Sequence, residues 1–271
     1  MLYLIGLGLY DEHDITLNGL AAIKTCTKVY LEQYTSMLAC SPQKLEELYG
    51  KKIEIATRTT IEQNAETILK EAETQNVAVL IAGDVFGATT HADLLLRAKK
   101  ANIEIKVIHN ASILNAIGCT GLELYKFGKT TSMPFFDEGW EPETAYDVTY
   151  ENQKTGMHTL ILLDIKIAEP SKEALLKGIP EEVSKIQPRF MTISQCIEQL
   201  YKIESKRKTH IITPEIKLLA CARIGHPDQQ IVYGTAEQLS NIDMGKPLHC
   251  LIVPGKLHFI EEEMLNLWSV D

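Results

Sequence analysis

The residues best suited to chemistry are a carboxylate between two glycines, in Gly83-Asp84-Val85-Phe86-Gly87. An apolar, β-branched run at residues 77–81 precedes them, and a helical pattern begins near Thr90. This order predicts a buried parallel strand ending in a tight turn, the place where open α/β sheets bind ligands. A carboxylate beside bare backbone favours a ligand with hydroxyl or amine groups rather than a phosphate.

A second glycine turn, Gly6-Leu7-Gly8, follows the apolar run Leu2–Ile5. The dinucleotide fingerprint requires a third glycine at position 11, where this chain has Asp11. No glycine turn continues into Gly-Lys-Ser/Thr, so no P-loop is predicted, and there is no Gly-x-Ser-x-Gly elbow for a serine nucleophile. The eight histidines show no metal-binding spacing, so we expect no metal site.

Composition indicates an ordinary globular protein. The chain has 271 residues, of which 45% are hydrophobic and 23% charged, and a formal net charge of −9. This charge argues against a broad electrostatic contact with nucleic acid or anionic lipid. There is no signal-peptide pattern and no apolar run near the ~20 residues of a membrane helix, so we expect a cytoplasmic protein. We expect reduced thiols in packed elements for all the cysteines: Cys26, Cys40, Cys119, Cys196, Cys221 and Cys250.

Strands and helices alternate along the first half of the chain, around the two glycine turns. We expect strands over Leu2–Ile5, Lys28–Leu31, Ile53–Ala56, Val77–Ile81 and Ile105–Ile108, and helices over Thr16–Ile23 and His91–Ala101. A further helix is expected to begin at a capping box, with Thr60 as N-cap and Gln63 reaching back. Alternating elements with short connections predict a parallel sheet covered by helices.

The second half changes in character and predicts an α+β domain with a mixed sheet. Its expected elements are a strand over His158–Ile165, a helix over Thr192–Ser205 and short apolar runs over Ile216–Ala222, Gln230–Tyr233 and Leu248–Val253. We therefore predict two α/β domains, residues 1–115 and residues 116–271. The aromatic segment from Phe127 to Trp140 has three possible roles: an interface, a lid over the substrate, or core packing.

Several segments, taken in order, resemble one family. They are the opening Met-Leu-Tyr-Leu-Ile-Gly-Leu-Gly-Leu with Asp14-Ile15-Thr16, Leu31-Glu32-x-Tyr34-Thr35-Ser36, Gly83 to His91, His109-Asn110-Ala111-Ser112-Ile113, Gly156-Met157-His158-Thr159, Leu162-Leu163-Asp164-Ile165-Lys166, Ala222-Arg223-Ile224-Gly225 and Pro247-Leu248-His249. Their order and spacing resemble the diphthine synthase (diphthine methyl ester synthase) family of the tetrapyrrole-methylase fold.

The resemblance implies an enzyme that methylates a modified histidine of translation elongation factor 2 with S-adenosylmethionine during diphthamide synthesis, as a homodimer. The cofactor would lie in the cleft between the two domains. Carried over by motif, its contacts would be Leu9, Asp84, Gly87, Ser112, Ile113, Leu163, Ile224 and His249. In the eukaryotic branch a carboxylate accepts a fourth methyl besides three on nitrogen, and two segments of this chain, Gly-Met-His-Thr-Leu and Ala-Arg-Ile-Gly, resemble that branch.

Other roles remain open for these residues. Asp84 binds a ribose hydroxyl, offsets the sulfonium charge, or only stabilises a helix N-terminus. His249 is an adenine-pocket residue or a satisfied core histidine, and Arg223 is a structural ion-pair partner as readily as a site residue. The strand-end residues Glu32, Tyr34 and Asp164 belong to the site or merely tie loops together.

Two basic residues, Lys166 and Arg189, are candidates for recognising the substrate's carboxylate. No side chain is identified as the base that deprotonates the substrate amine. Two other functions remain open, a tetrapyrrole methylase of the same fold and a non-catalytic nucleotide-sensing module. Methylation of elongation factor 2 by the protein would distinguish a diphthine synthase from both of these alternatives.

Overall fold

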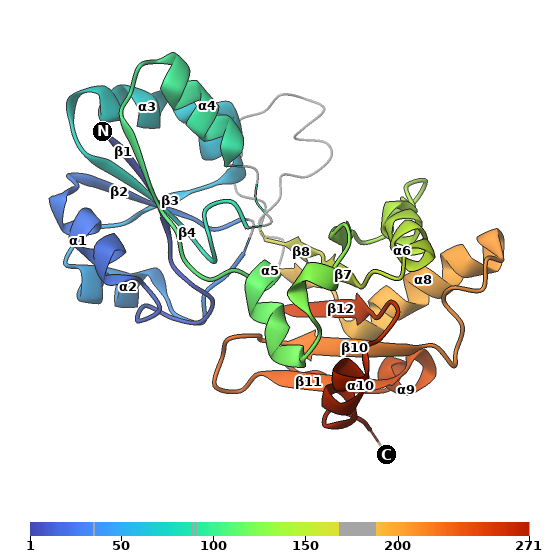
Figure 1. Cartoon of the computed structure of the whole chain (residues 1–271). Coiled ribbons are helices and arrows are strands. Elements are labelled where there is room, and N and C mark those ends of the chain that lie inside the picture. Colours follow the sequence, from blue (N-terminus) through green and yellow to red (C-terminus); the bar gives the residue numbers. More distant parts are fainter. Residues whose placement is uncertain (35, 88, 90, 168–187, 271) are drawn as a thin grey trace. The chain divides into compact units, whose positions relative to one another are not determined.

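A computed structural model describes residues 1–34, 36–87, 89, 91–167 and 188–270 of the chain (Figure 1). Thr35, Ala88 and Thr90, which belong to segments discussed above, lie outside the described residues. The chain divides into two compact units, Met1–Ala116 and Ile117–Asp271.

Unit 1 is built on a parallel five-stranded sheet, as the alternation of elements predicts. The strand order is β3-β2-β4-β1-β5, with β1 Leu2–Gly6, β2 Lys28–Glu32, β3 Glu54–Ala56, β4 Val77–Ile81 and β5 Ile105–Ile108. Strand β1 pairs in parallel with both β4 and β5, and β4 is buried at every residue. Because all five strands run the same way, their carboxyl ends lie along one edge of the sheet.

Helices cover both faces of this sheet. The helices are α1 Leu17–Thr25, α2 Pro42–Tyr49, α3 Ala65–Thr74 and α4 Ala92–Lys100. Along β4, Val77, Val79 and Ile81 pack with residues of α3 and α4, whereas Ala78 and Leu80 pack with residues of α1 and α2. Figure 1 shows α3 and α4 on one side of the strands and α1 and α2 on the other. The two-residue period of the strand thus separates two apolar cores.

The predicted capping box at Thr60 is wrong. A π-helix, Thr59–Gln63, occupies this segment, and α3 begins after it with Asn64 at the N-cap position. The reciprocal bonds join Thr57 and Thr60 instead, each hydroxyl accepting from the other residue's backbone N–H at 3.3 Å. Local side-chain bonds of threonine compete with helix capping, and here a neighbouring threonine takes the place of Gln63.

Unit 2 is built on a mixed five-stranded sheet, as predicted. The order is β11-β10-β12-β7-β6, with β6 Thr131–Met133, β7 Thr159–Leu163, β10 Lys217–Ala222, β11 Gln230–Thr235 and β12 His249–Val253. All neighbours are antiparallel except β6 and β7. The single strand expected over His158–Ile165 is divided: β7 ends at Leu163, and β8 Ile165–Lys166 pairs instead with β9 Arg189–Phe190.

The remaining elements pack around this sheet. They are η2 Ile117–Thr120, η3 Leu124–Lys126, α6 Thr144–Lys154, α8 Ile193–Arg207, α9 Ala236–Ser240 and α10 Phe259–Asn266, while α5 Ile113–Ala116 ends unit 1. Helix α8 begins with a capping box that joins Thr192 and Gln195. Phe135, only 3% exposed, belongs to the core of unit 2, so core packing is the correct reading for this aromatic.

All six cysteines are free, and four of them are buried, in keeping with reduced thiols in packed elements. Cys40 is half-buried and Cys119 is exposed. Desolvation raises the pKa of Cys119, so its exposed position does not make it a reactive thiolate. Among the described residues, no helix is both long enough and apolar enough to span a bilayer.

Candidate functional site

The two glycine turns of unit 1 meet backbone to backbone. Gly8 and Gly83 exchange hydrogen bonds, Gly8 N–H to Gly83 O at 3.2 Å and Gly83 N–H to Gly8 O at 2.6 Å, and both have positive φ, 85° and 79°. A Cβ on Gly6 would lie 2.6 Å from Gly83 O. The turns after β1 and β4 therefore form one structure that only glycine permits at these positions.

Asp14 fixes the first turn. Its Oδ2 accepts hydrogen bonds from the backbone N–H groups of Leu9 at 3.0 Å and Tyr10 at 2.8 Å. A carboxylate therefore already occupies the donors that a phosphate-binding turn would direct at its ligand. This bonding agrees with the interpretation of Gly6-Leu7-Gly8 as a strand-ending turn. It leaves the half-buried Leu9 directly after the Gly8–Gly83 contact.

Asp84 ties the second turn to the end of β5. Its Oδ1 accepts from Phe86 N–H at 2.9 Å, and its Oδ2 accepts from Asn110 N–H at 3.0 Å and lies 2.8 Å from His109 Nδ1. Burial raises the pKa of Asp84, but these hydrogen bonds more than offset it and lower the pKa below its ordinary value. The interpretation of Asp84 as a helix N-terminal carboxylate is wrong, because α4 begins only at Ala92 and none of these donors belongs to it.

Gly87 and Ser112 are in close contact. A Cβ on Gly87 would lie 2.5 Å from Ser112 Cβ, so Ser112 itself requires glycine at this position, whatever a ligand requires. Ser112 is buried, and its N–H donates to Asn115 Oδ1 at 2.7 Å at the start of α5. Ile113, the next residue, is half-buried. Ser112 and Ile113 thus lie at the same sheet edge as Asp84, as predicted from their position after β5.

The predicted site residues of unit 2 also lie at one sheet edge. Leu163 ends β7, His249 begins β12 and Ile224 follows the end of β10. In the register, Ala222 is opposite His249 and Leu162 is opposite Cys250, so the three residues lie in or directly beyond the ends of three adjacent strands. All three are buried, between 7% and 8% exposed.

Arg223 has a structural role. Its Nη1 donates to the carbonyl oxygens of Met244 at 2.7 Å and Lys246 at 2.6 Å, and its Nε lies 2.9 Å from Asp228 Oδ2. Its backbone N–H donates to Leu248 O at 2.9 Å. These bonds fix the loops that carry Ile224 and His249, so Arg223 is the structural ion-pair partner that one of the two interpretations expects.

His249 has a buried ring nitrogen without a hydrogen-bond partner among the described residues. Its Nε2 lies 2.9 Å from Lys246 O and therefore carries the proton, and the atom left over is Nδ1. Burial lowers the pKa of His249, so the ring is neutral near pH 7 and Nδ1 is an acceptor. A buried acceptor of this kind costs about 1–3 kcal/mol unless a ligand or water donates to it. The amino group of an adenine is such a donor, so this part of unit 2 fits the adenosine portion of S-adenosylmethionine.

The remaining strand-end candidates make hydrogen bonds near the ends of their strands, and their membership of the site stays a prediction. Glu32 accepts a hydrogen bond from Tyr34 N–H at 2.5 Å and lies 3.9 Å from the buried ring of His91. Asp164 accepts from Phe135 N–H at 3.0 Å. No sequence pattern predicts the contacts of His91 with Glu32 or of His109 with Asp84, although both histidines lie within the segments that carry the family resemblance.

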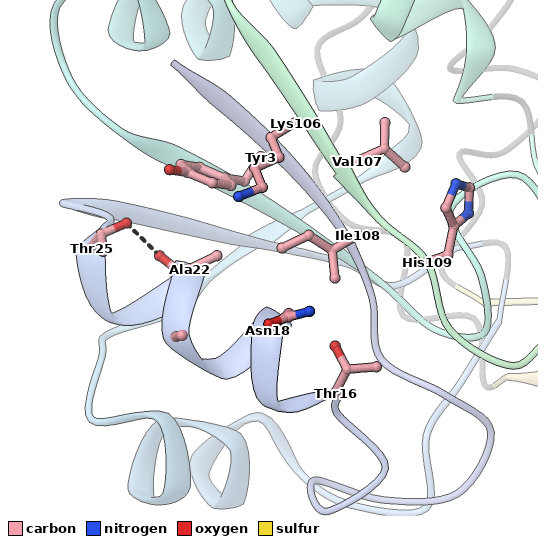
Figure 2. A pocket seen from close by; sticks show the side chains of 10 residues that line it. Tyr3, Thr16, Asn18, Ala22, Thr25, Lys106, Val107, Ile108 and His109 are labelled. Carbon is pink, nitrogen blue, oxygen red and sulfur yellow. Dashed lines mark hydrogen bonds between the residues drawn. The ribbon is translucent and has the colours of Figure 1, made fainter.

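A pocket of about 550 Å³ lies between α1 and β5 (Figure 2). Tyr3, Asn18, Lys106 and Ile108 line it, together with His109 at the end of β5. Since the His109 ring also contacts Asp84, the pocket adjoins the second glycine turn. No pattern in the sequence indicates this pocket, because its lining comes from β1, α1 and β5.

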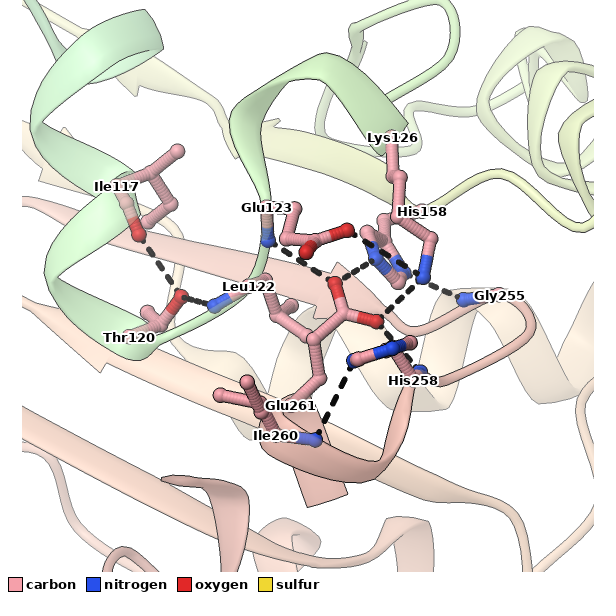
Figure 3. A network of polar contacts seen from close by, with 10 residues as sticks. All are labelled: Ile117, Thr120, Leu122, Glu123, Lys126, His158, Gly255, His258, Ile260 and Glu261. Carbon is pink, nitrogen blue, oxygen red and sulfur yellow. Dashed lines mark hydrogen bonds and ion pairs between the residues drawn. The ribbon is translucent and has the colours of Figure 1, made fainter. Parts of the chain in front are cut away.

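Unit 2 contains a buried polar network that no pattern in the sequence indicates (Figure 3). The Glu261 carboxylate accepts from Lys126 Nζ at 2.5 Å, His158 Nε2 at 2.9 Å, and the backbone N–H groups of Glu123 at 3.0 Å and His258 at 2.8 Å. Gly255 N–H donates to His158 Nδ1 at 2.9 Å, which places the proton of His158 on Nε2. Both ring nitrogens of His158 and both carboxylate oxygens of Glu261 have partners, so the network stabilises the fold rather than awaiting a ligand.

Three consecutive residues, Asp11, Glu12 and His13, place possible metal ligands within 4.8 Å of one another. Exposed acidic groups commonly have this arrangement without an ion. All three side chains come from a single short turn, so we assign no ion to them.

Comparisons with known proteins show the family to which the chain belongs. The family model of the tetrapyrrole (corrin/porphyrin) methylases matches residues 1–240. A diphthine methyl ester synthase of Homo sapiens is 48% identical over 277 residues, covering 100% of this chain and 95% of that protein. One of Kluyveromyces lactis is 50% identical, covering 98% and 89%. A crystal structure of diphthine synthase matches with a TM-score of 0.84 at 31% identity, covering 99% of this chain and 95% of the other. The chain therefore belongs to the tetrapyrrole methylase family and, within it, to the diphthine methyl ester synthases.

Proposed function

We propose that this chain transfers methyl groups from S-adenosylmethionine to the modified histidine of translation elongation factor 2, three to the amino nitrogen and one to the carboxylate. The observation that carries the proposal is identity of 48% and 50% over nearly the full chain with diphthine methyl ester synthases. The arrangement of the motif residues, gathered at one edge of each sheet, supports it.

We propose that two sets of residues bind the cofactor. From unit 1 these are Leu9, Asp84, Gly87, Ser112 and Ile113, and from unit 2 Leu163, Ile224 and His249. The buried Nδ1 of His249 supports an adenine contact, with the apolar Leu163 at the end of β7 and Ile224 just after the end of β10. The three groups that hold Asp84 support a role in shaping the turn as well as in contacting the ligand.

The chemistry asks for alignment more than for acid–base side chains. The methyl group of a sulfonium is already activated, and transfer is an in-line displacement by a neutral amine or a carboxylate. Rigid turns that hold the donor in place supply most of what such a step needs. The substrate amine must lose a proton before each nitrogen methylation, and a carboxylate or water chain suffices for that.

The assay that tests the proposal uses elongation factor 2 carrying the unmethylated intermediate. Incubation with S-adenosylmethionine should add methyl groups stepwise, and the mass of the target peptide should rise by four of them. Alkaline hydrolysis should then remove one, since one is an ester. Turnover on a porphyrinogen with none on elongation factor 2 would favour a tetrapyrrole methylase, and cofactor binding without any turnover would favour a sensing module.

We further propose that the protein acts in the cytoplasm and forms a homodimer. Its proposed substrate is a translation factor, which supports the location, and a homodimer is common in the family. Cell fractionation followed by detection of the chain tests the first part. The mass of the purified protein in solution tests the second.

A further inference from the structure

The short β8–β9 ladder brings together two basic residues that are far apart in the sequence. Lys166 and Arg189 are register partners in this antiparallel pair. Directly opposed residues share one face of a ladder, and both cations lie near the ring of Phe135. Arg189 Cζ is 3.8 Å from the ring centroid and Lys166 Nζ is 5.9 Å from it. The strand pairing thus makes one cluster of two residues that the sequence offers only as candidates.

The two cations differ in what already neutralises them. Lys166 Nζ lies 3.4 Å from Asp137 Oδ2, and both side chains are half-buried. Arg189 is exposed, and none of the described carboxylates pairs with it. With Lys166 matched by Asp137, the described side chains leave the guanidinium of Arg189 as the unmatched charge of the cluster. A guanidinium presents paired N–H donors whose spacing fits one carboxylate.

The aromatic platform under Arg189 is fixed. Phe135 is only 3% exposed, and its backbone N–H donates to Asp164 Oδ2 at 3.0 Å. Asp164 is itself held by a bond from its N–H to Met133 O at 3.1 Å. A guanidinium stacked on an immobile ring loses little further freedom when it binds a ligand. Asp164 directly follows Leu163, so this platform adjoins a residue assigned to the cofactor site within the same unit.

We propose that Arg189, with Lys166 beside it, binds the carboxylate of the modified histidine and so orients the substrate for methyl transfer. This inference rests on the proposed function and names the substrate group that one part of the site recognises. The inference also predicts that methylation of the carboxylate, the last transfer, weakens binding of the product. When a carboxylate oxygen attacks the sulfonium methyl, an O–CH₃ bond forms, the S–CH₃ bond breaks and S-adenosylhomocysteine leaves. The negative charge of the carboxylate disappears with the positive charge of the sulfonium, and the neutral ester no longer pairs with Arg189.

The test compares two ligands that differ only in this charge. Elongation factor 2 carrying the fully methylated residue is prepared as the methyl ester, and half of it is hydrolysed with mild alkali to the carboxylate. The wild-type protein should bind the carboxylate form about tenfold or more tightly than the ester, the range of a charge-assisted hydrogen bond. Arg189→Met should bind both forms equally, and Arg189→Lys should keep part of the preference.

Lys202→Met is the matched control. Lys202 Nζ also lies 5.9 Å from an aromatic centroid, that of Phe136, but it is paired with Glu141 at 2.6 Å. This variant should keep the wild-type preference, and all variants should bind S-adenosylmethionine with unchanged affinity in calorimetry. The proposal is overturned if Arg189→Met retains the carboxylate preference, or if it loses cofactor affinity to the same extent. Failure of the wild type to methylate elongation factor 2 would instead overturn the proposed function.

Discussion

Asp84 combines a predicted and an unpredicted role in one residue. Its position between glycines after a buried strand predicts a ligand site, and its carboxylate does lie at the carboxyl edge of the sheet. Yet the hydrogen bonds that hold it come from Phe86, His109 and Asn110. The residue therefore shapes two loops, and any contact with the cofactor adds to that function.

Replacing this carboxylate tests whether it contacts the cofactor as well as shaping the two loops. Asp84→Asn should weaken S-adenosylmethionine binding about tenfold or more, since the amide nitrogen that replaces one carboxylate oxygen cannot accept the hydrogen bonds now made to that oxygen, and the negative charge is lost. Circular dichroism should show an intact fold, and calorimetry measures the affinity. Because hydrogen bonds lower the pKa of Asp84, the carboxylate stays charged between about pH 5 and 8, so wild-type affinity should not fall through loss of this charge in that range.

His109→Ala is the control for Asp84→Asn, because it removes one donor and leaves the carboxylate in place. A smaller loss of affinity than in Asp84→Asn supports direct contact between Asp84 and the cofactor. Unaltered affinity in Asp84→Asn itself would show that the pocket lies elsewhere.

Between elements, the Glu261 network joins parts of unit 2 that the sheet does not. It links η3, the start of β7 and the first turn of α10 through one buried carboxylate (Figure 3). Burial raises the pKa of Glu261, but bonds from Lys126, two backbone N–H groups and His158 outweigh it and lower the pKa to about 2. Folding therefore favours the ionised form of this side chain.

The network predicts a specific acid sensitivity. A depressed folded pKa stabilises the protein fully above the ordinary pKa of 4.5, and this stabilisation is lost as the pH falls towards about 2. Glu261→Gln should lower the free energy of unfolding by roughly 3 kcal/mol at pH 7, the equivalent of this shift. The difference from wild type should shrink below pH 4.5 in urea titrations. Glu262→Gln, at the exposed neighbour, is the control, and a difference that does not change with pH would contradict the ionic explanation.

Across the molecule, each unit has its own five-stranded sheet, with two apolar cores in unit 1 and one in unit 2. Unit 2 also exposes apolar side chains on two neighbouring elements. Leu124 and Tyr125 of η3 are 42% and 79% exposed, and Phe259 and Ile260 of α10 are 62% and 52% exposed. Glu261 holds the two elements together through hydrogen bonds to η3 and the residue before it. Exposed large apolar side chains on two linked elements are a candidate for a protein interface.

The proposed homodimer is tested through this surface. Light scattering should give a mass near twice the 30.4 kDa of the chain. The double variant Tyr125→Asp, Phe259→Asp should move the mass towards the monomer, because two buried charges destabilise an apolar interface. Leu17→Asp, at a residue of unit 1 that is 86% exposed, should leave the mass unchanged. A monomeric wild type would refute the dimer, and a dimeric double variant would place its interface on another surface.

The parallel sheet, the mixed second sheet, the turn that carries Asp84 and the strand that begins at His249 could all be predicted from the chain alone. These features follow from local order: apolar runs of strand length, glycines where they end and helical spacing between them. The local pattern gave a wrong prediction at Thr60. A capping box with Gln63 was expected, but in the structure Thr60 exchanges hydrogen bonds with Thr57.

Only the tertiary structure decides which of these residues contact one another. Asp84 contacts Asn110 and Gly87 contacts Ser112, although each pair comes from turns after different strands. A strand pairing makes one cluster of Lys166 and Arg189. Glu261 binds Lys126 and His158, which lie 135 and 103 residues away in the sequence. Such contacts depend on strand register and on the packing of whole elements, which no local pattern in the chain encodes.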